Sequence, residues 1–271
     1  MPDQAITSKN HFAIKRARRL RKRTYRDREG LFLAEGLKLL SEAVRLKAVL
    51  KELLFVDSRS DEAHLIAGEA SMPIPAYKIS EDLMGLVSDV VTPPGILGVL
   101  EQVDEDYEEF MSRDGLSLLL IADQVRDPGN LGTLIRIADA VGVDGFLLTS
   151  GCVDLYNPKV LRSAAGSHLH LTLVRGVELG VFADSVRVRG MRLWGLDPRG
   201  GKSYLEVDYR EPTAIIVGNE AFGLSDEDRC VIDGTVEIEM PGKAESLNVA
   251  AAAAVVLFEA LRQRGHDAGG G

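Results

Sequence analysis

The sequence predicts an α/β protein of two domains, the second built on a mostly parallel sheet with helices on both faces. Three observations favour this fold class. Short apolar runs alternate with longer segments of helical spacing along most of the chain. Two of these runs, Leu118–Ala122 and Ala214–Gly218, carry no charged or polar side chain, as expected for strands covered on both faces. An acidic segment without a clear apolar face, residues 104–115, separates the two halves and is predicted to be a linker.

The first half, residues 1–103, is expected to alternate helices and strands. Phe12, Ile14, Ala17 and Leu20 recur near helical spacing, so residues 10–23 are predicted to form an amphipathic basic helix. The remaining predicted elements are strand 30–36, helix 37–45, strand 52–56, helix 61–68, strand 74–77, helix 80–87 and strand 96–101.

The second half, residues 116–271, repeats a unit of strand, loop and helix. Strand 116–122 leads into a turn at Asp127–Asn130 and then into a helix that carries Arg136. The other predicted elements are strand 145–149, helix 158–165, strand 169–174, helix 179–188, strand 192–196, strand 213–217, a short helix near Asp226 and a final strand and helix.

The final helix is the most apolar part of the chain. A short run ends at Met240, a loop follows, and Ser246 stands where a helix N-cap belongs. The alanine-rich run Val249–Phe258 has no polar face, which predicts a helix covered on nearly all sides. The cover is either the rest of the domain or a second subunit.

Charge is distributed unevenly along the chain. The net charge is −9, but residues 1–30 contain ten lysines and arginines and only three acidic residues, so this segment carries +7 and the remainder −16. A basic helix of this kind suits the phosphates of a nucleic acid. The alternative is a solvated charged face. The candidate RNA contacts are Lys15, Arg18, Arg19, Lys22 and Arg26.

Several protein classes are excluded by what the sequence lacks. Cys152 and Cys230 are too few and too far apart for a disulfide framework or a zinc site. His168 and His170 are expected on one face of a strand, with no third ligand spaced to complete a metal site. The longest apolar run is too short to cross a bilayer, and the start lacks the apolar core of a signal peptide. We expect a cytoplasmic protein without metal or membrane partner; a transit peptide is the alternative interpretation of the arginine-rich start.

Three motifs occur in the second half. The first contains Asn130, Gly132 and Arg136, the second Gly218-Asn219-Glu220 with Gly223-Leu224-Ser225, and the third Pro241-Gly242 with Ser246-Leu247-Asn248-Val249. In this order and spacing they resemble the SpoU, or TrmH, family of RNA ribose 2′-O-methyltransferases within the knotted SPOUT superfamily. The resemblance runs from Leu116 onward and implies a knotted, mostly parallel α/β domain.

A weaker resemblance covers the region before the linker. Arg26, Phe32, Glu35 and Gly36 are similar to a segment of the substrate-binding domains found at the N-terminus of some family members. This likeness implies a small α/β/α RNA-binding domain similar to certain ribosomal proteins.

The family resemblance implies S-adenosylmethionine as the cofactor. Carried over position by position, the cofactor-binding residues are Gly218, Asn219, Ile238, Met240 and Leu247. Ile238 and Leu247 are the expected adenine contacts, with packing in the core as the alternative. The sequence has neither a G-x-G-x-x-G fingerprint nor a Walker A motif, so the nucleoside must be held by these loops instead.

Five residues match the catalytic positions of the family. Arg136 is expected to bind the phosphate beside the target ribose and to favour ionisation of the 2′-hydroxyl, either as a stabilising cation only or also as the proton acceptor. The alternative is that Arg136 merely covers its helix. Asn130 is expected to orient Arg136 or the RNA, Glu220 to tie the motif loops together, and Ser246 and Asn248 to hydrogen-bond near the reacting centre.

Two positions depart from the family pattern. Residues 157–166 match a common stretch, but Ala164 stands where many members have serine. In the second motif Ala221-Phe222 replaces the usual glycine and acidic residue. Phe222 is expected either to stack on a base or to pack in the loop.

The predicted function is therefore methyl transfer from S-adenosylmethionine to an RNA ribose 2′-hydroxyl by a homodimer. The two-domain layout favours rRNA over tRNA as the substrate. Two other classes compete with this interpretation: a non-catalytic RNA-binding or assembly protein that keeps the fold, and a nucleotide-dependent oxidoreductase, which lacks its glycine fingerprint.

Overall fold

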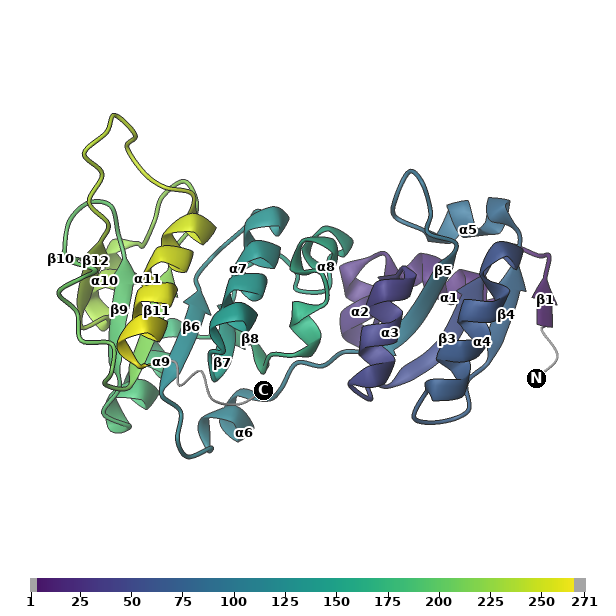
Figure 1. Cartoon of the computed structure of the whole chain (residues 1–271), viewed down its shortest axis with the longest axis horizontal. Helices are drawn as coiled ribbons and strands as arrows, with labels where there is room; N and C mark the ends of the chain where they lie inside the picture. The colour runs from purple at the N-terminus through teal and green to yellow at the C-terminus, as the bar shows by residue number, and fades with distance from the viewer. Residues whose placement is uncertain (1–3, 266–271) are drawn as a thin grey trace. The chain divides into compact units, whose positions relative to one another are not determined.

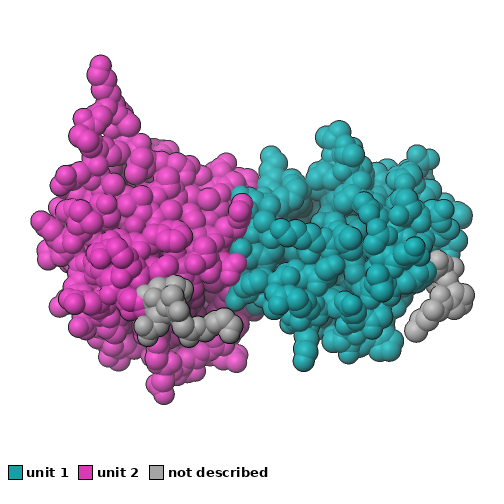
Figure 2. All heavy atoms as spheres, viewed as in Figure 1, with its two compact units in different colours: residues 1–103, 156–170 teal, residues 104–155, 171–271 magenta. Residues whose placement is uncertain are grey.

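The computed structural model describes residues 4–265. The chain forms two compact units, shown in different colours in Figure 2. Unit 1 contains residues 1–103 and 156–170, and unit 2 contains residues 104–155 and 171–271. A segment of the second half of the sequence thus packs with the first half. The functional division into an RNA-binding domain, a linker and a methyltransferase domain stays a prediction.

Unit 1 is a three-layered α/β/α structure around a five-stranded sheet of order β1-β4-β3-β5-β2 (Figure 1). Strands β1, β4 and β3 run parallel, whereas β5 runs antiparallel to both β3 and β2. Its elements are β1 Gln4–Ile6, α1 Phe12–Leu20, α2 Arg23–Glu29, β2 Leu31–Glu35, α3 Leu37–Arg45, β3 Leu50–Phe55, α4 Ser60–Glu69, β4 Ala76–Ile79, α5 Glu81–Val87, β5 Ile96–Glu101 and α8 Pro158–Ala164.

Alternating side chains of the unit 1 strands bury both faces of the sheet. Leu31 and Leu33 of β2 share a buried cluster with Ile14 of α1 and Met84 of α5. Phe32, on the opposite face of β2, contacts Tyr156 and lies on the side where α3 and α4 pack. The small α/β/α domain that the sequence predicts is therefore confirmed as an architecture.

Unit 2 is built on a seven-stranded sheet of order β10-β12-β9-β11-β6-β7-β8, in which every strand pair is parallel. Its elements are α6 Tyr107–Met111, β6 Leu118–Ala122, α7 Pro128–Val141, β7 Gly145–Thr149, β8 Leu173–Val177, α9 Leu179–Val188, β9 Arg192–Leu196, β10 Lys202–Ser203, β11 Thr213–Val217, α10 Asp226–Val231, β12 Gly234–Glu237 and α11 Val249–Gln263. The predicted fold class is confirmed, while the knot stays a prediction.

Helices cover both faces of the unit 2 sheet. Helix α7 packs against α11 on one face, where Figure 1 shows the two side by side. On the other face, Phe182 of α9 and Phe110 of α6 are fully buried against alternate side chains of β6 and β11. The acidic segment that the sequence assigns to a linker thus contributes a helix to this core.

Several predicted elements differ from the structure, among them strand 74–77, which is found at Ala76–Ile79. The first helix ends at Leu20 rather than Arg23, because Lys22 adopts an extended conformation and a second helix starts after it. Strand β8 begins at Leu173, since the left-handed Ala165 and Gly166 lead into a 3₁₀ turn, Ser167–Leu169. His168 and His170 therefore do not lie on a strand. Strand β12 ends at Glu237, so Ile238 and Met240 belong to a loop.

The final helix also corrects the sequence interpretation. Asn248, not Ser246, is its N-cap: the Asn248 Oδ1 accepts hydrogen bonds from Ala250 N at 2.9 Å and Ala251 N at 3.3 Å. The helix is not covered on nearly all sides within one chain. Ala253 and Leu257 are fully buried, but Phe258 is 49% exposed on the opposite side. Within residues 4–265, no helix is both long and apolar enough to span a membrane.

Candidate active site

Four loops meet at the carboxyl edge of the unit 2 sheet. Because neighbouring strands β12, β9, β11 and β6 are all parallel, the loops that follow them emerge at the same edge, where open α/β sheets bind their ligands. These loops contain the second and third motifs and the start of the helix that carries the first motif.

Glu220 joins the second motif to the first. Its Oε1 accepts hydrogen bonds from Asp127 N at 2.9 Å and from Asn130 Nδ2 at 3.2 Å, and its Oε2 accepts one from Arg126 N at 3.2 Å. Burial acts to raise the pKa of Glu220, but these hydrogen bonds outweigh it, and the pKa lies below its usual value. Glu220 is therefore an anion at neutral pH, and its hydrogen bonds connect the second motif loop to the first; a part in catalysis stays a prediction.

Asn130 extends this connection to the third motif. Its Oδ1 accepts a hydrogen bond of 2.8 Å from Asn248 Nδ2, while its own Nδ2 donates to Glu220. Both ends of the Asn130 amide are thus used, and its backbone N–H donates to Asp127 at 2.8 Å. The chain Glu220–Asn130–Asn248 links all three motifs through side chains, with Asn130 at its centre.

Asn219 and Gly218 shape the loop of the second motif. Asn219 Oδ1 accepts a hydrogen bond from Ala221 N at 2.9 Å, and its Nδ2 donates one to Gln124 O at 2.9 Å. Both ends of its side-chain amide therefore bind within the protein. The Asn219 backbone N–H and carbonyl also pair with Gly223, at 3.1 Å and 2.8 Å, so this residue fixes the shape of the loop. A Cβ on Gly218 would lie 2.5 Å from the backbone of Gly223, so the close approach of the two loop ends requires glycine at 218.

A cavity of ≈ 250 Å³ lies between these loops. All five predicted cofactor-binding residues line it, together with Glu220 and Ser246. Leu247 is 40% exposed and Ile238 half-buried, so the alternative that both pack in the core is wrong. Partly exposed apolar side chains around a cavity suit the flat, apolar face of an adenine. The residues present therefore fit S-adenosylmethionine.

One wall of this cavity contains residues that were not predicted from the sequence. Leu196, Asp197, Pro198 and Arg199, directly after β9, also line it. Asp197 is 3% exposed and forms ion pairs with Arg199 and Arg229. The position of an aspartate at the carboxyl end of a predicted parallel strand was a signal that could have identified this wall.

Comparisons with known proteins identify the family. Residues 117–258 match the SpoU rRNA Methylase family, and residues 12–98 match the MRM3-like substrate binding domain. This chain belongs to the SpoU rRNA methylase family.

Two relatives align over nearly the whole chain. A 23S rRNA (guanosine(2553)-2′-O)-methyltransferase of Bacillus subtilis, RlmP, is 35% identical over 93% of this chain and 97% of its own length. A 23S rRNA (uridine(2479)-2′-O)-methyltransferase of Streptomyces viridochromogenes is 34% identical, covering 96% of this chain and 92% of its own. The crystal structure of the SpoU methyltransferase AviRb from the same organism, in complex with the cofactor AdoMet, superposes with a TM-score of 0.84 at 32% identity, over 94% of this chain and 98% of that one.

Arg136 stands apart from the other predicted catalytic residues of this SpoU chain. It lies on the exposed face of α7, opposite the buried Leu134 and Ile135, and does not line the cavity. Within the described residues it has no hydrogen-bond or ion-pair partner. The structure thus brings together Asn130, Glu220 and Asn248, places Ser246 at the cavity, and leaves Arg136 as a cation facing solvent.

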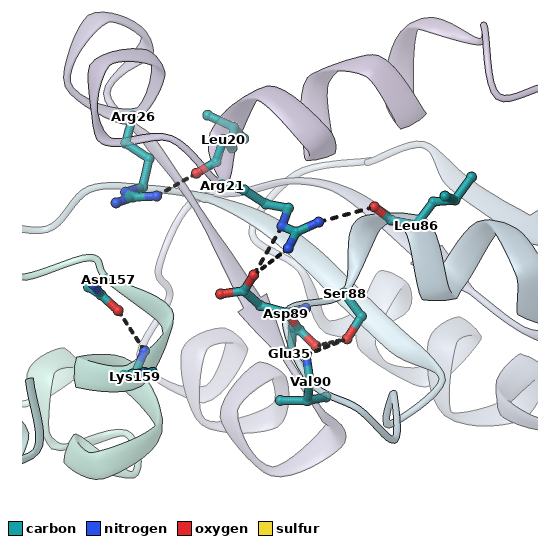
Figure 3. A network of polar contacts seen from close by, with 10 residues as sticks. All are labelled: Leu20, Arg21, Arg26, Glu35, Leu86, Ser88, Asp89, Val90, Asn157 and Lys159. Carbon is teal, nitrogen blue, oxygen red and sulfur yellow. Dashed lines mark hydrogen bonds and ion pairs between the residues drawn. The ribbon is translucent and has the colours of Figure 1, made fainter.

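The predicted RNA contacts of the SpoU chain lie in unit 1 and fall into two groups. Lys15, Arg18, Arg19 and Lys22 are exposed along α1 and its C-terminal end. Arg26 is different: it is 4% exposed, and its Nη1 donates to the Leu20 carbonyl at 2.7 Å, as Figure 3 shows. A buried guanidinium that satisfies the last turn of α1 is not free for a phosphate, so Arg26 is removed from the predicted contacts.

Two family departures have clear structural outcomes. Ala164 is fully buried in unit 1, where a methyl group packs and no hydroxyl partner is required. Phe222 is 82% exposed, so the alternative that it packs within the loop is wrong. Stacking of Phe222 on a base stays a prediction. Within residues 4–265, no group of three or more histidine, cysteine, aspartate or glutamate side chains is placed to hold a metal ion.

Proposed function

We propose that this SpoU methylase transfers a methyl group from S-adenosylmethionine to a ribose 2′-hydroxyl of rRNA. The observation that carries the proposal is the hydrogen-bonded chain Glu220–Asn130–Asn248 beside a cavity lined by Gly218, Ile238, Met240 and Leu247. A non-catalytic protein would have no need to tie three loops together around an open cavity. The identified relatives, which are named as rRNA 2′-O-methyltransferases, support rRNA over tRNA.

The cofactor loops have separate tasks in this proposal. S-adenosylmethionine supplies an electrophilic methyl group when it is bound. Ile238 and Leu247 hold the adenine by apolar contact, and the backbone at Gly218 and Met240 holds its polar edge. Glu220 and Asn130 keep the loops in a fixed arrangement, so that little ordering is left to occur on binding.

Arg136 acts on the RNA rather than on the cofactor. Its guanidinium carries a fixed charge and, within the described chain, no partner, so it is free to engage a phosphate with two parallel hydrogen bonds. A phosphate held there would position the neighbouring ribose, and the charge would stabilise the alkoxide that develops on the 2′-oxygen. Ser246 and Asn248 lie on the third motif loop and are assigned to hydrogen bonds near that oxygen.

Unit 1 is assigned to RNA binding. Lys15, Arg18 and Arg19 of α1 and Lys22 just after it form an exposed basic face, and none of the four has an acidic ion-pair partner within the described chain. The other basic residues nearby are neutralised in part, as by the Arg21–Asp89 ion pair of 2.8 Å. The absence of acidic partners among the described residues leaves these four charges for phosphates.

The functional form is assigned as a cytoplasmic homodimer. Ala251 and Phe258 lie seven residues apart on the same exposed face of α11 and present an apolar surface that one chain does not cover. An identical surface on a second copy would cover both in a symmetric interface.

Calorimetry and mapping of methylation test the proposed activity. The purified protein is titrated with S-adenosylmethionine and, in parallel, with NADH. It is then incubated with unmethylated rRNA and the cofactor, and 2′-O-methyl positions are mapped by primer extension at low nucleotide concentration. We expect binding of S-adenosylmethionine only and one new modified position. Binding without any new modified position in rRNA or tRNA would favour the assembly-protein alternative.

A further inference from the structure

The cavity contains a single basic side chain. Of the residues that line it, only Arg199 carries a positive charge, and the two acidic ones are Asp197 and Glu220. Both carboxylate oxygens of Glu220 accept hydrogen bonds from the first motif loop. Arg199 is therefore the cation to which an anionic group inside the cavity would turn.

Arg199 is held in place from two sides. Its backbone N–H and its Nε both reach Asp197 Oδ1, at 2.9 Å and 3.3 Å, and its Nη2 donates to the Leu224 carbonyl at 2.7 Å. The Asp197 side chain that fixes it is only 1% exposed, whereas the Arg199 side chain is 55% exposed. A buried carboxylate thus orients a guanidinium whose outer part faces the cavity and solvent.

The three charged side chains at this wall of the cavity leave a positive excess. Asp197 is shared by two arginines, Arg199 and Arg229, so the three side chains together carry one positive charge. Of the five N–H donors of Arg199, two are used, and both Nη1 hydrogens and one Nη2 hydrogen have no acceptor within the described residues. Such a preorganised donor group suits a carboxylate or a phosphate.

We propose that Arg199 binds the carboxylate of the methionine moiety of S-adenosylmethionine, with Asp197 as the residue that positions Arg199. The carboxylate is the only anionic group of that cofactor, and Arg199 is the only cation that lines the cavity. The inference rests on the proposed function, because it assumes that S-adenosylmethionine is the molecule that occupies the cavity.

A ligand with the carboxylate removed tests the contact directly. The binding of S-adenosylmethionine and of decarboxylated S-adenosylmethionine is measured by calorimetry with the wild-type protein and with Arg199→Gln. A hydrogen-bonded charge pair of this kind contributes about tenfold or more to affinity. We expect Arg199→Gln to lose about that factor for S-adenosylmethionine and to bind the decarboxylated ligand like the wild type.

Two further variants separate binding from scaffolding. Arg210→Gln removes an exposed arginine of unit 2 that pairs with Asp208 and does not line the cavity, so both affinities should stay unchanged. Arg199→Lys keeps the charge but not the planar fork, so it should recover part of the discrimination between the two ligands. In each Arg199 variant Asp197 keeps its ion pair with Arg229, so the fold should persist. Thermal unfolding of each variant measures this.

The outcomes are distinct. Equal loss for both ligands in Arg199→Gln would assign Arg199 to the scaffold and overturn the inference. Unchanged cofactor binding with weakened binding of rRNA would assign Arg199 to a phosphate of the substrate and overturn it as well. If the wild-type protein binds neither ligand, the proposed function itself fails, and a result of that kind is recognised before any variant is compared.

Discussion

Asn248 donates its side-chain amide to Asn130 Oδ1 at 2.8 Å, although the two residues are 118 positions apart in the sequence. The Oδ1 of the same Asn248 caps α11, and Asn130 lies in the first turn of α7. One hydrogen bond therefore connects the N-terminal ends of two packed helices, α7 and α11. A substitution at either asparagine should therefore alter the arrangement of all three motif loops.

Asn130→Asp tests this coupling with a minimal change of shape. The new carboxylate keeps an acceptor for Asn248 but loses the donor to Glu220, and it places a second negative charge next to that side chain. Repulsion should loosen the loops, so we expect affinity for S-adenosylmethionine to fall by about tenfold, on the scale of a lost hydrogen bond to a charged group. Calorimetry measures it, with Asn10→Asp, an exposed position in unit 1, as the control. Wild-type affinity in Asn130→Asp would show that the clamp is dispensable.

The strands and helices of unit 2 could be predicted from the sequence more closely than the loops that join them. The apolar strands β6 and β11 and helix α9 were predicted with their observed ends or within two residues, because continuous apolar runs allow few alternatives. The helix cap was placed at Ser246 instead of Asn248, although both are good capping residues. Asn248, which caps the helix, also donates to Asn130, and a contact between residues so far apart has no local signal in the sequence.

Burial limited the prediction of the site in the same way. Lys15 and Arg26 look alike in a basic stretch, yet one is exposed and the other is buried against the end of α1. The wall formed by Asp197 and Arg199 carries no family motif, and its only sequence signal is the position of Asp197 directly after a predicted strand; the pairing of β9 with β11 places it beside the second motif. The motifs identify the loops that line the cavity. The order of the strands in the sheet decides which other residues line it as well.

The buried His168 predicts a pH dependence of stability in unit 1. It is fully buried, neither ring nitrogen has a hydrogen-bond partner within the described residues, and burial lowers its pKa from 6.5 to about 4. The unfolded chain therefore takes up a proton at higher pH than the folded one. Stability is unaffected above pH 6.5, falls as pH drops towards about 4, and then levels off, with a total loss of up to about 3 kcal/mol.

His168→Leu should remove this slope. Chemical unfolding of the wild type and the variant between about pH 7 and pH 4 measures it, and His64→Gln, a change at an exposed histidine of the same unit, is the control. The same pH dependence in wild type and His168→Leu would mean that the imidazole is hydrated or protonated in the folded protein.

Reversal of charge on α1 tests the RNA-binding face. In a triple variant, Arg18, Arg19 and Lys22 are changed to glutamate; all three are exposed, so the fold should persist. We expect weaker binding of rRNA and a smaller dependence of affinity on salt, since each lost phosphate contact lowers that dependence by about one unit of slope. Filter binding at several salt concentrations measures both.

A matched triple reversal elsewhere completes that experiment. Three exposed basic residues outside α1 are changed to glutamate: Lys47, Arg192 and Lys202. The net charge of the two triple variants is the same, so a general effect of charge would weaken both equally. Equal affinities would reject α1 as the RNA-binding face, and cofactor affinity should remain at the wild-type value in each.

Phe258→Glu tests the homodimer. The side chain is 49% exposed on the open face of α11, so a charge there is tolerated by the single chain but not in an apolar interface. We expect sedimentation to give twice 29.4 kDa for the wild type and 29.4 kDa for the variant. Leu65→Glu, at a residue 67% exposed in unit 1, should leave the dimer intact. A wild-type protein that sediments as a single chain at micromolar concentration would contradict the assignment.

Arg136 decides between the catalytic interpretation and simple coverage of a helix. If the exposed guanidinium only covers α7, Arg136→Ala should cost little stability and leave turnover close to normal. If it holds the phosphate and stabilises the developing alkoxide, the same change should lower the rate by about a hundred- to a thousandfold, as when an oxyanion donor is deleted. Affinity for S-adenosylmethionine should be unchanged in either case, because Arg136 does not line the cavity.

Arg136→Lys distinguishes charge from geometry at the same position. Lysine keeps the positive charge but cannot offer two parallel N–H donors to a phosphate, so we expect it to restore only a small part of the lost rate. The measurement is single-turnover methyl transfer to rRNA with cofactor affinity determined on the same samples. A change at Thr133, which is exposed one turn earlier on α7, to alanine serves as the control. Near-normal rates in both Arg136 variants would assign this residue to the helix surface and leave Asn130, Glu220 and Asn248 as a clamp without a catalytic cation.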